Sequence, residues 1–218
     1  HVGVGGVHPF EIAFFRNLFS LMFMVAIFRR AGLASFRTPQ PGMQILRALS
    51  AIAGMTCWFM ALALMPLAEA TALSFTSPLF ATVGAALFLR ETVRLRRWMA
   101  VVVGFAGALI LLRPGFETVS PAAGLALVAA FFIATSGLLM KSLSLRNSPL
   151  TITMYMAALT TPISLIPALF VWTMPGPETL LWCLLLGMMA SGVQLCMANA
   201  FALAEISAVL PFDFSRLV

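Results

Sequence analysis

Polar side chains that could do chemistry are few in this sequence, and some of them lie inside long apolar runs. Arg16 lies within the run over residues 10–28, and Asp213 precedes Arg216 by three residues in the last run. A charge inside a bilayer costs free energy, so its default interpretation is functional. The chemistry would be the binding of a polar solute or a proton. The alternatives are that Arg16 snorkels to the membrane surface and that Asp213 and Arg216 form a structural ion pair.

Two prolines, Pro78 and Pro211, interrupt apolar runs close to polar side chains. A proline inside a helix frees the backbone carbonyl one turn earlier, and such carbonyls are tolerated at membrane depth only where protein or water satisfies them. The breaks therefore indicate either packing kinks or the walls of a polar cavity. The substrate-binding residues that we predict are Ser74, Thr76, Ser77, Pro78, Pro211, Asp213 and Arg216, together with Arg16 and two aromatic candidates, Trp58 and Tyr155.

Two acidic residues, Glu69 and Glu205, each lie at the start of an apolar run. An acid in the first turn of a helix stabilises the helix dipole, which is the structural interpretation. The functional alternative is a role in gating or in coupling to protons, and we name both residues as candidates for that role.

Motifs of catalysis, metal binding and cofactor binding are missing from the sequence. Both histidines precede the first apolar run, and there is no HExxH, no Gly-x-Ser-x-Gly and no phosphate-binding glycine-rich loop. Cys57, Cys183 and Cys196 lie singly in apolar runs, and we interpret them as small buried apolar residues. We therefore expect neither an enzyme nor a bound metal or cofactor.

The composition explains why polar groups are so few. Of the 218 residues, 61% are hydrophobic and 9% are charged, and the mean hydropathy is +1.03. Soluble domains carry about 25% charged residues, so a water-soluble globule is excluded, and a disordered chain is excluded as well. The net charge of +6 comes from residues scattered in short gaps between apolar runs, so nucleic acid is not an expected partner. The sequence predicts an all-α, polytopic membrane protein.

Seven apolar runs are long enough to cross a bilayer, which takes about 20 residues. They cover residues 10–28, 45–65, 69–89, 97–112, 122–143, 151–172 and 180–203, and an eighth run begins near residue 205. Prolines and glycines lie in the gaps between them, as expected of turns. The chain begins with His1 and stops at Val218 inside an apolar run, which we interpret as part of a longer protein.

Positive charges are distributed unequally between the gaps. Ten Lys and Arg residues lie in or beside the segments 29–47, 90–97 and 141–146, whereas Arg113 alone lies in the other gaps. Because cytoplasmic loops are enriched in Lys and Arg, these three segments are predicted to be cytoplasmic.

The sequence also repeats itself. Residues 67–70 (LAEA) recur as 203–206 (LAEI), and residues 8–12 (HPFEI) correspond to 148–152 (SPLTI), an offset of 140 residues for the second pair. An odd number of spans separates the copies, so they cross the membrane in opposite directions. Inverted repeats are typical of secondary transporters, whose substrate site lies at the repeat interface near the midplane.

The repeat predicts two five-helix halves. The first covers residues 1–113 and lacks its first helix. The second covers residues 122–218, where it ends within its fourth helix and lacks its fifth. The complete bundle would therefore have ten helices.

Four segments resemble a known family: HPFEIAFFR, MPLAEATALSFTSPLF, LFLRETVRLRRWMAVVVGFAGALILLRPG and ALAEISAVLPFDFSRL. They look like the drug/metabolite transporter superfamily, EamA type, and the resemblance extends over nearly the whole chain. It implies a bacterial inner-membrane carrier of ten helices with both termini in the cytoplasm. Members of that family move amino acids, S-adenosylmethionine, riboflavin and other small polar metabolites.

We therefore expect a secondary transporter of a small polar metabolite that is amino-acid-like, nucleoside-like or vitamin-like. Two alternatives remain: a membrane scaffold that transports nothing and, further from the observations, an intramembrane enzyme. The expected partners are a small-molecule substrate and the lipid bilayer, with a homodimer left open.

Overall fold

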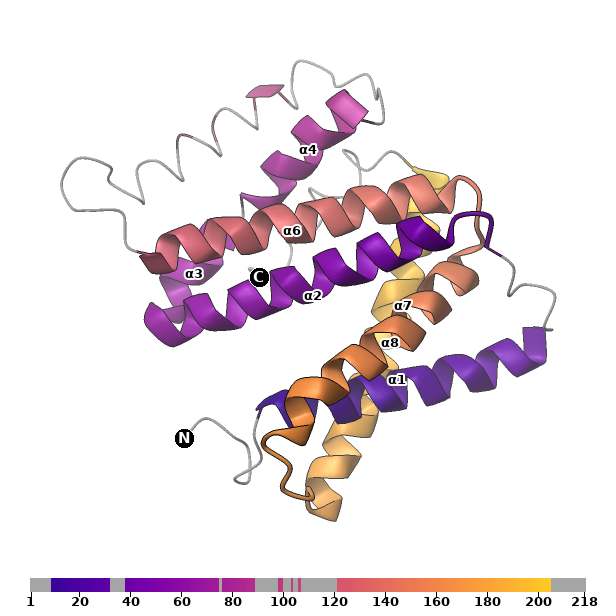
Figure 1. The fold of residues 1–218 in the computed structure, drawn as a ribbon. Helices are drawn as coiled ribbons and strands as arrows, with labels where there is room; N and C mark the ends of the chain where they lie inside the picture. The colour runs from indigo at the N-terminus through magenta and orange to yellow at the C-terminus, as the bar shows by residue number, and fades with distance from the viewer. Residues whose placement is uncertain are drawn as a thin grey trace. The chain divides into compact units, whose positions relative to one another are not determined.

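The computed structural model describes residues 9–31, 38–74, 76–88, 98–99, 103, 106 and 121–204. The regular secondary structure of these residues is helical throughout, as predicted (Figure 1). The helices are α1 (Pro9–Ala31), α2 (Pro41–Leu64), α3 (Leu67–Ser74), α4 (Ser77–Phe88), α6 (Pro121–Ser144), α7 (Pro149–Leu169) and α8 (Pro177–Leu203). Most of the run over 97–112, and all of the run from 205, lie outside the described residues.

Six segments of the described chain are long and apolar enough to cross a membrane. They correspond to the predicted runs over 10–28, 45–65, 69–89, 122–143, 151–172 and 180–203, and one of them combines α3 with α4. The prediction of a polytopic helical membrane protein is confirmed.

The chain divides into two compact units, which we describe separately. The first unit comprises residues 1–45 and 143–202, and it contains α1, α7, α8 and the first turn of α2. The second unit comprises residues 46–142 and 203–218, and it contains the rest of α2 with α3, α4 and nearly all of α6. Each unit takes helices from both predicted repeats, and the repeat boundaries themselves stay a prediction.

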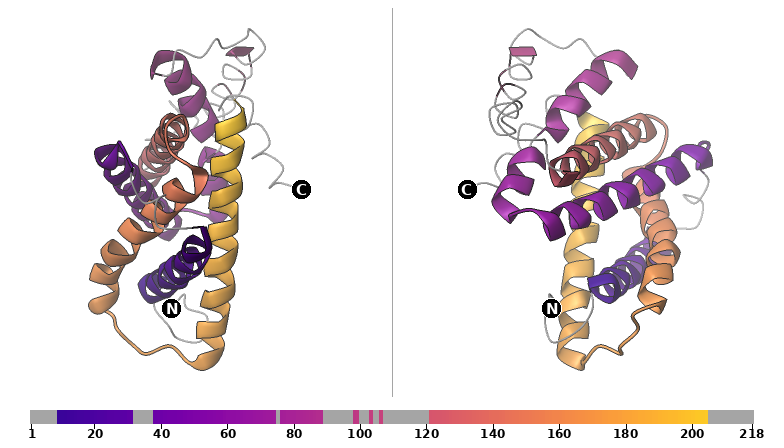
Figure 2. Two further views of the ribbon diagram at one scale, coloured as in Figure 1. Left: turned by 90° about the vertical axis from the view of Figure 1, so that its right-hand side faces the viewer. Right: turned by 60° about the vertical axis from the view of Figure 1, so that its left-hand side comes forward.

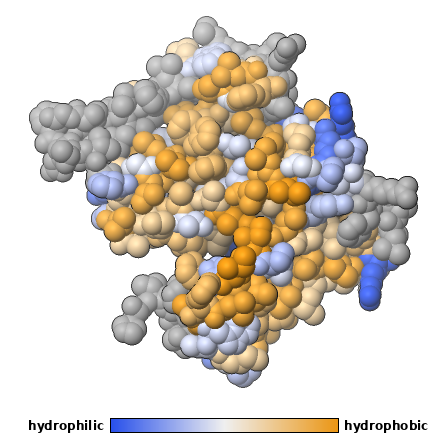
Figure 3. All heavy atoms as spheres, in the orientation of Figure 1, coloured by the Kyte–Doolittle hydropathy of each residue, from blue (hydrophilic) through white to orange (hydrophobic). Residues whose placement is uncertain are grey.

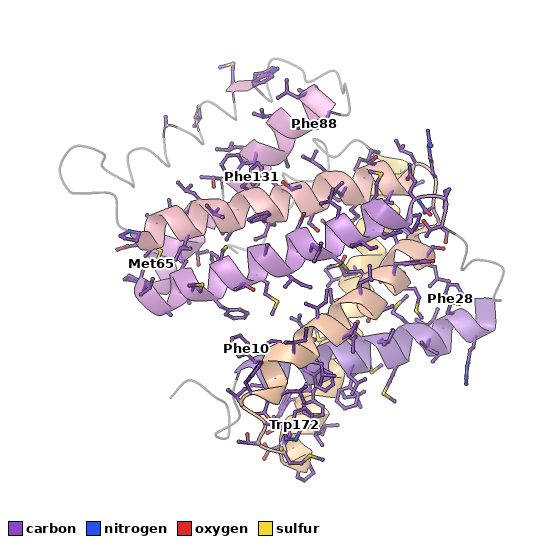
Figure 4. All side chains as sticks on the ribbon, in the orientation of Figure 1. Phe10, Phe28, Met65, Phe88, Phe131 and Trp172 are labelled. Carbon is purple, nitrogen blue, oxygen red and sulfur yellow. The ribbon has the colours of Figure 1, made fainter. Side chains whose placement is uncertain are left out.

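The core of the first unit lies between α1 and α7, which pack against each other (Figures 1 and 2). Phe10 and Trp172 lie at one end of α1 and Phe28 lies at the other (Figure 4). Two apolar clusters fill this core. Their buried members are Phe14, Phe15, Ala168 and Cys183 in one cluster, and Met24, Phe28, Met154 and Ala157 in the other.

Local signals fix the start of α7, and a distant contact fixes its end. α7 begins at Pro149 because the hydroxyl of Ser148 caps it, accepting a hydrogen bond at 3.2 Å from the backbone N–H three residues further on. The predicted end near residue 172 is wrong, because α7 ends at Leu169. Beyond that point, Thr173 is bonded to Glu11 of α1, so the chain leaves the helical path.

Side chains of α1 and α7 also interlock at mid-helix. The hydroxyl of Thr161 on α7 lies 3.2 Å from the carbonyl oxygen of Asn17 on α1. Leu21 of α1 packs against the cluster that contains Met154 and Ala157 of α7. The inverted repeat that would relate the two helices stays a prediction.

Helix α6 is the central element of the second unit. A Cβ placed on Gly54 of α2 would lie 3.2 Å from the Cβ of Phe132 on α6, and one placed on Gly84 of α4 would collide with another α6 side chain. Leu73 of α3 packs in one cluster with Ala126 of α6. Small residues therefore allow three helices to approach α6 closely, which is how helices associate where lipid replaces water.

Large apolar side chains cover the outer surface of the described helices. Phe88 is 82% exposed and Phe170 is 85% exposed. On the face shown in Figure 3, apolar residues dominate and the strongly hydrophilic ones gather near helix ends. Such a surface would aggregate in water but suits a bilayer.

The cysteines differ in burial. Cys183 is buried and Cys57 is partly buried, whereas Cys196 is exposed on α8. The prediction that all three are buried is therefore wrong for Cys196, because a small apolar thiol can face lipid as readily as it can face the core.

Candidate functional site

Polar side chains of α1 and α7 meet inside the apolar first unit. Asn17 donates its side-chain N–H to the hydroxyl of Ser164 at 3.2 Å. The hydroxyl of buried Thr161 donates to the carbonyl oxygen of Ala157 in its own helix at 2.7 Å, and it also lies 3.2 Å from the carbonyl oxygen of Asn17. Ser164 in turn donates to the carbonyl oxygen of Thr161 at 3.0 Å. We call Arg16, Asn17, Thr161 and Ser164 the α1–α7 polar cluster.

The guanidinium of Arg16 belongs to this cluster. Its Nη2 donates to Oδ1 of Asn17 at 3.2 Å, and its Nε is buried with no hydrogen-bond partner among the described residues. Arg16 lies seven residues into α1, about 10 Å along the helix, within a candidate span. The bond to Asn17 favours an inward role over snorkelling, because a snorkelling guanidinium turns toward the membrane surface.

Helix α8 approaches α1 closely at Gly187. A Cβ there would lie 2.7 Å from the carbonyl oxygen of Arg16 and 2.9 Å from the backbone nitrogen of Ser20. These are backbone atoms that cannot move aside, so only glycine fits at this crossing. One turn further along α8, the hydroxyl of buried Ser191 lies 2.6 Å from the hydroxyl of Ser20. α8 thus packs against the helix that carries the polar cluster.

Glu11, near the start of α1, is fully buried. Its two carboxylate oxygens accept hydrogen bonds from the backbone N–H and from the hydroxyl of Thr173, the latter at 2.8 Å. Trp172 packs beside this contact, with its ring centroid 5.9 Å from that of Phe14 and 5.6 Å from that of Phe15. The segment after α7 is therefore fastened to the start of α1 by charge-assisted hydrogen bonds and aromatic packing.

The predicted break at Pro78 is present: α3 ends at Ser74 and α4 begins at Ser77. The carbonyl oxygen of Leu73 accepts from both the backbone N–H and the hydroxyl of Thr76, at 3.0 and 2.7 Å. The hydroxyl of Ser74 donates to the carbonyl oxygen three residues earlier at 2.7 Å. Both hydroxyls therefore satisfy the interrupted backbone, and their role in substrate binding stays a prediction.

The remaining predicted residues are dispersed. Trp58 on α2 and Tyr155 on α7 are partly buried, and Glu69 is exposed in the first turn of α3. Arg16 and Tyr155 belong to the first unit, whereas the α3–α4 break with Trp58 and Glu69 belongs to the second. The other predicted residues lie outside the described residues: Glu205, Pro211, Asp213 and Arg216.

The sequence analysis missed Asn17, Thr161 and Ser164. A signal was present, because Asn17 adjoins Arg16 in an apolar run, and Thr161 and Ser164 flank Pro162 in another. Thr and Ser often bond only to their own helix, and a single sequence does not show which of them reaches a neighbour.

The α1–α7 polar cluster supplies groups that form hydrogen bonds. It offers guanidinium, amide and hydroxyl groups, which suit the carbonyl and hydroxyl oxygens of a polar solute. In the part of the chain that the structure describes, no group of three His, Cys, Asp or Glu residues could hold a metal ion.

Comparison with known proteins identifies the family. Residues 2–113 match the EamA-like transporter family. The chain is also 37% identical, over 206 residues, to a riboflavin transporter of Rhizobium johnstonii, and this match covers 94% of the chain and 68% of that protein. The chain belongs to the EamA-like transporter family. This confirms the family resemblance, and with the six candidate spans it identifies this EamA-like protein as a multi-pass protein of the bacterial inner membrane.

Two further relatives have names that state what they transport. A riboflavin transporter of Vibrio cholerae is 43% identical over 186 residues, which are 84% of the chain and 62% of that protein. An S-adenosylmethionine uptake transporter of Rickettsia bellii is 31% identical over 212 residues, which are 97% of the chain and 73% of that protein. The chain thus spans 62% to 73% of the length of these three relatives.

Proposed function

We propose that this EamA-like protein is a secondary transporter that carries a small polar metabolite across the inner membrane by alternating access. One observation carries the proposal: the three relatives described above are all named as transporters of small metabolites. The two riboflavin transporters are 43% and 37% identical to the chain, against 31% for the S-adenosylmethionine transporter. Riboflavin is therefore the first substrate to test.

The α1–α7 polar cluster supports transport over a scaffold role. Lipid tails are as apolar as leucine, so a passive bundle gains nothing from a guanidinium inside a span. Arg16 has one hydrogen-bond partner among the described residues, the amide of Asn17, whereas a guanidinium carries five N–H donors. The unused donors suit the oxygens of a passing solute.

The substrate site that we propose extends beyond this cluster. The further candidates are those predicted from the sequence: Ser74, Thr76, Ser77 and Pro78 at the α3–α4 break, the polar residues around Pro211, and Arg16, Trp58 and Tyr155. Glu69 and Glu205 stay candidates for gating or coupling. The two prolines are predicted to lie at similar depth because the inverted repeat pairs their helices.

Uptake of labelled riboflavin tests this function. The full-length protein is expressed in a riboflavin-auxotrophic bacterium that lacks its own riboflavin carrier, beside the Arg16→Gln variant and the matched Arg29→Gln variant at the exposed end of α1. We expect uptake with the wild type and with Arg29→Gln, and at least a tenfold loss with Arg16→Gln at equal membrane abundance. Uptake that stays at the level of the empty vector, for riboflavin and for the other metabolite classes, would contradict the proposal.

A further inference from the structure

An amide without hydrogen-bond partners is buried at the start of α2. Gln44 is 2% exposed, and neither Oε1 nor Nε2 of its side chain has a partner among the described residues. The backbone N–H of Gln44 is satisfied, since it donates to the carbonyl oxygen of Gln40 at 3.3 Å. Native proteins satisfy nearly all buried polar groups, so an amide left bare at both ends calls for a partner beyond the described residues, such as a bound solute.

Two other buried amide oxygens belong to the same compact unit. Oε1 of Gln40 and Oδ1 of Asn147 are buried and have no hydrogen-bond partner among the described residues, although the Asn147 side chain donates to the carbonyl oxygen of Leu143 at 3.1 Å. Gln40 lies four residues before Gln44, immediately ahead of the first turn of α2. We call Gln40, Gln44 and Asn147 the buried amides.

All three amides belong to the first compact unit and lie toward the same end of it. Residues up to Ile45 and residues from Leu143 to Ala202 form one compact unit. The first turn of α2 and the turn between α6 and α7, which carries Asn147, lie at the same end of that unit (Figures 1 and 2). The positive residues in the gaps predict that this end faces the cytoplasm.

The chemistry of the buried amides selects a class of ligand. Gln44 presents a donor beside an acceptor, and buried Arg47 follows three residues later in α2. The matching partner is another planar group with a donor beside an acceptor, which an amide or imide provides. Gln and Asn pair through two hydrogen bonds with the edges of nucleic-acid bases in this way.

We propose that Gln44 is a substrate-binding residue at the cytoplasmic end of the transport path, and that it binds the amide or imide edge of a heterocycle. This inference rests on the proposed transport function and names the part of the substrate that is recognised. Riboflavin is a suitable probe because its ring system carries an N–H between two carbonyl groups.

The stability of the ligand-free protein gives the first test. Gln44→Met keeps the length of the side chain and removes its hydrogen-bonding groups. An apolar side chain in place of an unsatisfied amide stabilises a protein, so the melting temperature of purified, ligand-free Gln44→Met protein is expected to rise. If Gln44 instead forms hydrogen bonds within the folded protein, the melting temperature of Gln44→Met should fall, because the substitution leaves its partners without a bond.

Binding selectivity gives the second test. Affinities for riboflavin and for 3-methylriboflavin, which lacks the imide N–H, are measured by flavin fluorescence on wild type, Gln44→Met and the control Thr56→Val. Thr56 is exposed on the same helix. Wild type and the control are expected to prefer riboflavin by roughly ten- to a hundredfold, the range for a two-bond amide pair, and Gln44→Met is expected to lose that preference.

The outcomes separate this inference from the proposed function. A rise in melting temperature together with lost selectivity supports it. A fall in melting temperature, or unchanged selectivity in Gln44→Met, overturns the inference while wild-type riboflavin uptake leaves the transport function standing. If the wild-type protein transports none of the tested metabolites, the proposed function is wrong, and this inference, which rests on it, is wrong as well.

Discussion

The hydroxyl of Thr161 on α7 shares its hydrogen between the carbonyl oxygen of Ala157 in its own helix, at 2.7 Å, and that of Asn17 on α1, at 3.2 Å, where both helices lie within candidate membrane spans. The side chain of Asn17 continues the contact, since it donates to Ser164 and accepts from Arg16. One asparagine therefore joins α1 to α7 and orients a guanidinium. Mutation can test its contacts and its proposed part in transport.

Asn17→Leu is expected to reduce uptake about tenfold, because Arg16 loses the acceptor that orients it. Stability should fall by about 1–3 kcal/mol, because the partly buried guanidinium of Arg16 is left without its acceptor. Uptake and thermal unfolding of the same preparations measure the two effects. Asn199→Leu is the control, because exposed Asn199, among the described residues, bonds within its own helix to the carbonyl oxygen of Leu195. Equal loss of uptake in both variants would contradict a specific role for Asn17.

Gly187→Ala is expected to destabilise the protein by about 1–3 kcal/mol, the usual cost of overpacking. The added methyl group would lie 2.7 Å from the carbonyl oxygen of Arg16 and force α8 away from α1. Gly192→Ala, five residues further along α8, meets nothing within 4 Å and should leave the melting temperature unchanged. Thermal unfolding in detergent measures the melting temperatures of both variants. Similar values would show that α8 does not cross α1 closely at Gly187.

Thr173→Ala is expected to cost about 1.5–3 kcal/mol of stability, because the buried carboxylate of Glu11 loses a hydrogen bond from a hydroxyl. Thr173→Ser keeps the hydroxyl and should restore most of that loss. The free energy of unfolding is measured by denaturant titration under conditions in which unfolding is two-state. If Thr173→Ser is as unstable as Thr173→Ala, the methyl group and not the hydrogen bond stabilises this end of α1.

Cysteine labelling checks the predicted orientation. In a background without Cys57, Cys183 and Cys196, single cysteines replace Arg37, Arg94 or Glu178. The first two should be shielded from a membrane-impermeant thiol reagent in intact cells, whereas the third should react. The reverse pattern would overturn the orientation and the charge argument behind it.

Local signals in the sequence were sufficient for much of the fold. Spans could be predicted from the length of apolar runs, and boundaries such as Ser148-Pro149 could be predicted because the capping chemistry lies within a few residues. Pro78 likewise marked the division between α3 and α4, since a proline disrupts a helix wherever that helix packs.

Contacts between distant residues were beyond sequence reasoning. The end of α7 depends on Thr173 meeting Glu11, far away in the sequence. Asn17, Thr161 and Gln44 could not be ranked above other polar residues, because a span is apolar toward lipid as well as toward protein. Without a polar outer face, the periodicity that shows the inner face of a soluble helix is absent.

The central claim, that the protein is a carrier of a small metabolite, is tested most directly by counterflow. Purified full-length protein is reconstituted in liposomes loaded with unlabelled riboflavin, and entry of labelled riboflavin from outside is followed in time. A carrier that alternates between two faces is expected to give rapid, transient accumulation of label above equilibrium, which 3-methylriboflavin supports poorly. Entry no faster than in protein-free liposomes, for riboflavin and for the nucleoside-like and amino-acid-like solutes alike, would contradict the account.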